Sequence, residues 1–160
     1  MPMPPASTVS ALLLPGAAGL AVTAGLGVAA GVVLALVLTT GAPDQATIGI
    51  VEDELVVRPL GAMRVWALSR GVSVPVSAVA DIGVADRRAV PLGLRAPGAY
   101  LPGVVCAGTY RRRGSKSLWM VGRTSRVLVI DFVDQSYDRV VVQVAEPEAA
   151  AIALRRALLG

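Results

Sequence analysis

The sequence predicts a mainly β domain that follows one membrane-spanning helix and ends in an α-helix. Three observations support this prediction. No charged side chain occurs before Asp44, so all 15 Lys and Arg and all 11 Asp and Glu lie at or after that residue. Short alternating or β-branched runs then recur between turn residues, which is typical of strands. From Pro147 onward, apolar residues follow a helical spacing. We therefore expect a tail over residues 1–15, a membrane helix over 16–40, a linker over 41–46 and a folded domain over 47–160.

The membrane helix is predicted from residues 16–39, which contain neither a charged residue nor proline. At about 1.5 Å of rise per residue, these 24 residues span roughly 36 Å, enough to cross a hydrocarbon core of about 30 Å. A secretory signal peptide would need a positively charged start and a shorter apolar core. Two crossings within the longer uncharged stretch that runs through Thr40 would leave each at about 15 residues, which is too short. A buried core helix is the remaining alternative, but such helices rarely lack charge over so long a run.

Small residues recur at every fourth position of this predicted helix, at Gly27, Gly31 and Ala35. Such spacing lets two helices approach closely, so one interpretation is helix–helix packing in a homodimer or with another membrane protein. The alternative interpretation is compositional, because a helix built from Ala, Gly, Val and Leu often produces the same spacing by chance.

The orientation of the predicted helix follows from the charges beside it. Lys and Arg near a span favour the cytoplasmic side, counted within about 15–20 residues of its ends. None precedes residue 16, whereas Arg58 falls within the window on the other side. The single cysteine, Cys106, is expected to be a buried free thiol, which fits a reducing compartment. We therefore expect a single-pass protein of the cell membrane with its folded domain in the cytoplasm.

Eight strands are expected in the folded domain, and their spacing favours an antiparallel meander bent into a barrel or sandwich. The last two are the clearest and form a hairpin. In one of them Leu128, Ile130 and Phe132 alternate with a mixed set, so these three side chains are predicted to face the core. The expected strands cover residues 47–51, 55–58, 63–68, 79–85, 107–112, 117–122, 126–132 and 139–145.

Two further segments complete the domain. Residues 87–105 are rich in Pro, Gly and Ala, and so long a loop indicates a functional or partner-covered segment. The terminal helix begins at Glu146-Pro147-Glu148, because proline suits the first turn and acid suits the positive end of the helix dipole. Its apolar stripe omits Ile152 and consists of Ala150, Ala151, Leu154, Ala157 and Leu158.

A glycine-rich segment at residues 97–103 is followed by segments at 107–111, 118–121, 126–130 and 140–148, and two earlier segments cover 50–55 and 72–82. Together these segments resemble the bacterial pleckstrin-homology (PH) domain. The resemblance covers roughly residues 47–159. It implies a partly open barrel of two nearly orthogonal antiparallel sheets, with the last helix plugging one corner, often tethered to transmembrane helices. Eukaryotic relatives bind phosphoinositides through a basic hairpin between the first two strands. The corresponding turn here, Glu52-Asp53-Glu54, is acidic, which argues against that route.

The composition disfavours catalysis. The chain has no histidine, which removes the usual general base and the imidazole metal ligands, and one cysteine cannot form a disulfide or a zinc site. The resemblance transfers no catalytic residue either. We therefore expect no catalytic residues, no metal site and no cofactor. A net charge of only +4, without a helix-turn-helix or RNA-binding signature, also gives no reason to expect nucleic acid as a partner.

One basic cluster is the candidate contact site. Arg111, Arg112 and Arg113 are consecutive, with Lys116 and Arg123 nearby in sequence. Such a cluster suits anionic lipid headgroups or an acidic partner. The alternative is a solvated hairpin tip, because alternation along a strand places Arg111 and Arg113 on one face and Arg112 on the other.

These observations favour a membrane-anchored, PH-like, non-catalytic binding or scaffolding module that docks a protein partner beside the lipid bilayer. An accessory subunit of a membrane enzyme or transport complex is the alternative function. A stand-alone enzyme is a third hypothesis, which the absence of histidine disfavours.

Overall fold

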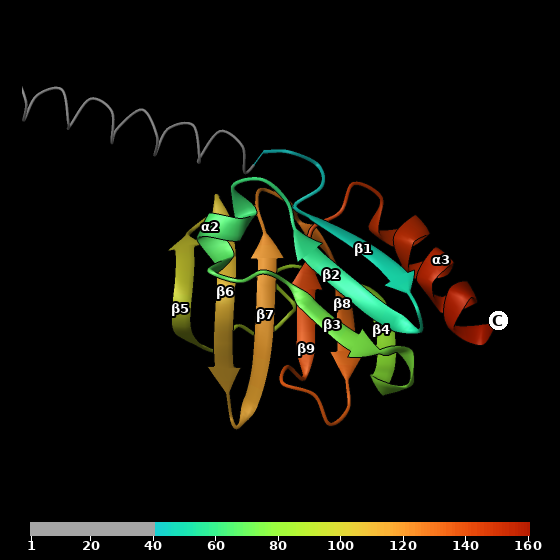
Figure 1. The fold of residues 1–160 in the computed structure, drawn as a ribbon. Helices are drawn as coiled ribbons and strands as arrows, with labels where there is room; N and C mark the ends of the chain where they lie inside the picture. Colours follow the sequence, from blue (N-terminus) through green and yellow to red (C-terminus); the bar gives the residue numbers. More distant parts are fainter. Residues whose placement is uncertain (1–40) are drawn as a thin grey trace, which may run out of the picture. The chain divides into compact units, whose positions relative to one another are not determined.

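A computed structural model describes residues 41–160, except for the side chains of Ala96 and Pro97. The predicted membrane helix, with Gly27, Gly31 and Ala35, lies outside the described residues. Within residues 41–160, no helix is long and apolar enough to cross a membrane. The described part is mainly β, with two sheets and a C-terminal helix, as the sequence predicts (Figure 1).

The smaller sheet has three antiparallel strands in the order β1-β2-β3. They are β1 (Ala46–Val51), β2 (Glu54–Pro59) and β3 (Val72–Pro75). Glu52 and Asp53 form the two-residue β1–β2 turn with φ values of 50° and 64°, the left-handed conformation that suits such hairpins. The alternating residues Leu55 and Val57 point inward and are fully buried.

The larger sheet has six strands in the order β4-β8-β9-β7-β6-β5. They are β4 (Val79–Asp86), β5 (Leu94–Leu101), β6 (Val105–Arg112), β7 (Ser115–Val121), β8 (Arg126–Phe132) and β9 (Arg139–Val142). The expected β8–β9 hairpin is confirmed, but β9 pairs with β7 in parallel. The predicted antiparallel meander is therefore wrong at one junction. The loop after β7 carries the chain past one strand position, which β9 then fills.

The main core lies between the two sheets, and its central strands have the predicted orientation. Leu128 and Ile130 are fully buried there, with Phe132 at 6% exposure, so the assignment of this face of β8 is confirmed. The opposite face of the large sheet carries a second apolar cluster around Trp119 and Val141. The central strands are therefore buried on both faces for much of their length.

One predicted strand is wrong. Residues 63–68 contain the short helix α2 (Met63–Ala67), which buries Met63 and Ala67 one turn apart and ends at Leu68 in a left-handed conformation. Five residues are too few to show helical periodicity in the sequence.

The expected loop over residues 87–105 also differs, since it contains the edge strand β5. Edge strands tolerate Pro and Gly, so a segment rich in these residues can form a strand although its composition predicts a loop. Gly98 lies at an irregularity in the β5–β6 pairing, where a Cβ atom would approach the Ala107 oxygen to 2.3 Å.

The terminal helix α3 (Pro147–Leu159) begins at the predicted proline and packs against β4 and β8. Its buried residues are Pro147, Ala151 and Leu154. Ala157 is exposed, so the buried stripe is narrower than predicted, and Ile152 is 51% exposed. Glu148 pairs with Arg126, and Arg155 donates a hydrogen bond to the Ile82 carbonyl, so polar contacts also hold the helix on the sheet.

Replacing the inward side chains of β8 tests this packing. Leu128→Ala and Ile130→Ala are each expected to lower the free energy of unfolding by about 2–5 kcal/mol, because each leaves a cavity between the sheets. The control Ile152→Ala removes a half-exposed side chain and should cost about 0.5 kcal/mol or less. Chemical denaturation of residues 41–160 measures all three. Equal losses for core and control variants would contradict the assigned faces.

Candidate functional site

The predicted basic cluster is centred on the β6–β7 hairpin. Arg113 and Gly114 form its turn with φ values of 49° and 85°. Arg111 lies opposite Lys116 in the strand register, and Arg112 lies opposite Ser115. The three arginines are exposed, and Arg112 lies on the other face of the hairpin from Arg111, as strand alternation predicts.

Lys116 is held by the neighbouring β8–β9 turn. Its ammonium nitrogen lies 4.3 Å from the centre of the Tyr137 ring, a cation–π contact. The backbone N–H of Lys116 donates a hydrogen bond of 2.6 Å to the Asp138 carboxylate. The hydroxyls of Tyr137 and Thr109 are 3.1 Å apart, within hydrogen-bond distance. Lys116 therefore stabilises the junction of two turns through both its ammonium group and its backbone N–H.

A groove of about 460 Å³ adjoins the hairpin, and one of the three arginines that line it is paired with a carboxylate. The Arg139 guanidinium makes two hydrogen bonds with the Asp131 carboxylate, and these bonds raise the pKa of Arg139. The groove is lined by Pro91, Arg112, Arg113, Ser115, Ser117, Asp131, Phe132, Asp138 and Arg139. Only Arg112 and Arg113 contribute positive charge that no carboxylate within residues 41–160 neutralises.

Arg123 lies apart from the other four residues of the predicted basic cluster, so the cluster does not form one patch. It follows β7 in the loop before β8, beyond the end of the ladder where Val121 faces Cys106. At about 3.3 Å per residue, β7 separates this loop from Lys116 by roughly 20 Å. Arg111, Arg112, Arg113 and Lys116 thus lie at one end of the strand and Arg123 at the other.

Arg123 instead lies beside two arginines that the sequence analysis missed, Arg87 and Arg88. Together they line a cavity of about 610 Å³, named here the arginine pocket. Its remaining lining residues are Asp86, Tyr100, Gly103, Thr124 and Ser125. The only signal in the sequence was the adjacent pair Arg87-Arg88, because nothing local connects it with residue 123.

Hydrogen bonds fix the frame of the arginine pocket. The Arg87 guanidinium donates to the Gly122 carbonyl at 2.9 Å, and its backbone N–H donates to the Ser125 carbonyl at 2.7 Å. The backbone N–H of Arg88 donates to the Asp86 carboxylate at 2.8 Å. These contacts attach the segment after β4 to the loop between β7 and β8.

Gln143 connects the arginine pocket with the start of the described chain. Its side chain is buried, with its oxygen accepting the Gly122 N–H at 2.9 Å. Its side-chain nitrogen donates to the carbonyls of Ala42 and Pro43 at 2.9 and 3.3 Å. The backbone carbonyl of Gln143 also accepts the N–H of Gln45 at 3.1 Å. Gly122 directly precedes Arg123, so the pocket lies beside the point where the chain enters the domain.

Cys106 is buried, as predicted, and it lines a separate cavity that shares Arg87 and Arg88 with the arginine pocket. Burial raises the pKa of its thiol, while the neighbouring Tyr110 hydroxyl and Arg87 guanidinium oppose that shift. Burial also raises the pKa of Tyr110. A buried thiol held in its neutral form is a poor nucleophile, so its position indicates a structural role.

A second surface feature is an apolar groove of about 590 Å³ between β1 and α3, named here the β1–α3 groove. Within residues 41–160, β1 pairs only with β2, so its other edge is free of strand pairing. The acidic residues Asp44 and Glu146 are among the residues that line the groove. Its other lining residues are Ala46, Thr47, Ile48, Leu60, Val144, Ala145, Ala149, Ala150, Ala153 and Leu154.

Comparison with known proteins finds no matching family model, no matching curated protein and no matching solved structure. Within the described residues, no group of three or more His, Cys, Asp or Glu side chains could hold a metal ion. The two surfaces themselves are therefore the basis for a proposed function, because a fold alone does not specify one.

The role of Gln143 is open to a direct test. Gln143→Ala leaves the buried N–H of Gly122 without its acceptor, and we expect the free energy of unfolding to fall by about 1–3 kcal/mol. Hydrogen exchange should also accelerate over residues 122–125. Gln135→Ala, the same substitution in the β8–β9 turn, is the matched control and should change neither quantity appreciably. Unchanged exchange in Gln143→Ala would contradict the proposed link.

Proposed function

We propose that this chain is a membrane-anchored, non-catalytic binding module whose PH-like domain docks a protein partner next to the bilayer. The observation that carries this proposal is the β1–α3 groove, where an apolar surface borders the unpaired edge of a strand. The anchor is proposed from residues 16–39, which carry no charge over a length sufficient to cross a bilayer. The cytoplasmic placement of the domain rests on the charges flanking that segment.

Two features support the PH-like assignment. Two sheets enclose one main core, and the Glu146-Pro147-Glu148 turn opens a helix that packs against β4 and β8. The parallel pairing of β7 with β9 departs from the all-antiparallel sheets that the resemblance implies. The proposed domain is thus a variant in which the last hairpin is inserted into the larger sheet.

The β1–α3 groove has the properties of a site for an extended peptide. A peptide that adds a strand to an exposed sheet edge gains affinity from backbone hydrogen bonds and specificity from alternate side chains. Here β1 offers the edge, and Ala149, Ala150 and Ala153 leave room beside it for apolar side chains. The carboxylates of Asp44 and Glu146 favour a basic residue at one end of that peptide.

In vivo photocrosslinking tests this function. A photoreactive residue in place of Ala149 is expected to give one adduct of defined mass, and Ala153→Glu should abolish it by placing a charge in the apolar groove. The matched control Ala157→Glu lies one turn further along α3, outside the groove and also exposed, and should leave the adduct intact. Loss of the adduct in Ala157→Glu as complete as in Ala153→Glu, or no adduct from position 149, would contradict the proposed docking site.

A further inference from the structure

We propose that the arginine pocket holds the phosphate of an anionic lipid headgroup at the surface of the bilayer. This inference rests on the proposed membrane anchor and adds a second ligand to the domain, distinct from a peptide in the β1–α3 groove.

The chemistry of the pocket suits a phosphate group. Guanidinium groups bind phosphate oxygens through paired, charge-assisted hydrogen bonds. The side chains of Arg88 and Arg123 are exposed and form no ion pair within residues 41–160. Ser125 adds a hydroxyl group to the lining, whereas the Thr124 hydroxyl already donates to the Arg126 carbonyl at 3.0 Å. Asp86 supplies the one carboxylate, and the backbone N–H of Arg88 already occupies one of its oxygens.

The position of the pocket points to the bilayer as the source of that phosphate. If residues 16–39 cross the membrane, the three peptide links between Thr39 and Ala42 allow a separation of at most about 11 Å. Ala42 is hydrogen-bonded to Gln143, which is hydrogen-bonded to Gly122 beside Arg123. Connectivity and two hydrogen bonds therefore keep the pocket near the point where the chain leaves the membrane.

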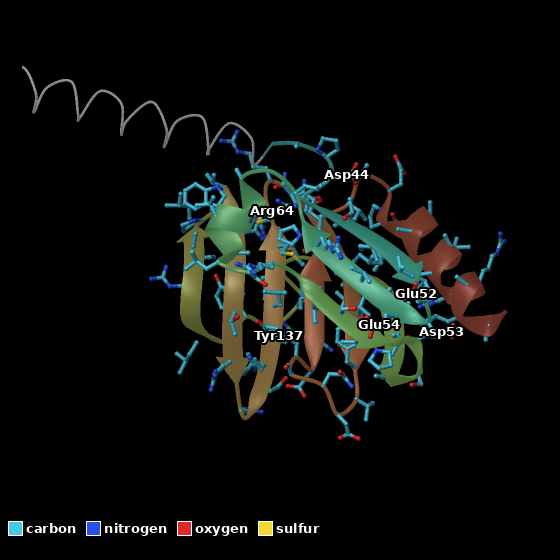
Figure 2. All side chains as sticks on the ribbon, in the orientation of Figure 1. Asp44, Glu52, Asp53, Glu54, Arg64 and Tyr137 are labelled. Atoms are coloured by element: carbon cyan, nitrogen blue, oxygen red, sulfur yellow. The ribbon has the colours of Figure 1, made fainter. Side chains whose placement is uncertain are left out.

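The positions of other charged groups are consistent with an orientation in which the arginine pocket faces the bilayer. The β6–β7 turn lies at the end of the domain opposite residues 41–45 (Figure 1), so Arg113 does not reach the surface that the pocket would face. Glu52, Asp53 and Glu54 also gather away from Asp44 (Figure 2). Near the start of the described chain, the Asp44 carboxylate accepts the Ala145 N–H at 2.8 Å, which occupies one of its oxygens.

The test uses the full chain in a mild detergent. Native mass spectrometry counts the phosphatidylglycerol molecules that remain bound, with phosphatidylcholine at the same concentration as the reference. The wild type should retain phosphatidylglycerol preferentially. The double variant Arg88→Gln, Arg123→Gln should lower that preference on the order of tenfold, because two basic residues at an anionic surface are lost. Both side chains are exposed, so the fold should survive, which a thermal melt verifies.

The matched control is Arg111→Gln, Arg113→Gln, which removes the same charge from the hairpin and should leave the preference unchanged. Equal losses in both double variants, or no loss in the first, would overturn the proposal. Complete displacement of phosphatidylglycerol by inorganic phosphate would assign the pocket to a soluble ligand and overturn the lipid assignment. Release of the chain from membranes by alkaline carbonate would contradict the anchor itself. An anchored chain without the lipid preference contradicts the arginine pocket alone.

Discussion

The buried side-chain amide of Gln143 is the interaction on which the arrangement of this domain depends. A primary amide out of water must satisfy both its oxygen and its nitrogen, since an unpaired buried polar group costs about 1–3 kcal/mol. Gln143 does so with Gly122 on one side and with Ala42 and Pro43 on the other. One side chain thereby joins the start of the described chain, the loop after β7 and the end of β9. It also stands at the junction where β9 pairs in parallel with β7.

This link places both candidate binding surfaces at the same end of the domain. The arginine pocket lies near residues 42–44 because Gly122, which precedes Arg123, is hydrogen-bonded to Gln143. The acidic part of the β1–α3 groove lies there because Asp44 itself lines it. The β6–β7 turn lies at the opposite end (Figure 1). A lipid in the pocket and a peptide in the groove would therefore bind at the same end of the domain, next to the proposed anchor. A bound headgroup would fix the domain against the bilayer and so restrict the directions from which a partner reaches β1.

Local patterns in the sequence predicted the elements whose burial follows a simple period. Alternation in β8 identified its core face correctly, and Pro147 marked the start of α3. Elements without such a signal were missed: α2 is too short to show a period, and the Pro and Gly of β5 reflect its edge position. The parallel β7–β9 pair and the arginine pocket depend on contacts between residues far apart in sequence. Alternation within one strand contains no information about them, which is why Arg123 was grouped with the hairpin arginines.

The end of the domain that bears the arginine pocket is proposed to face the bilayer. Spin labels at Ser125→Cys and Arg113→Cys, introduced separately into the full chain, report it directly, since Cys106 is buried and stays unlabelled. In bilayers containing phosphatidylglycerol, power saturation with oxygen and a water-soluble nickel complex measures the depth of each label. A label at 125 is expected in the headgroup region and a label at 113 in bulk water. Equal aqueous exposure of both labels, or a label at 113 nearer the membrane, would contradict this orientation.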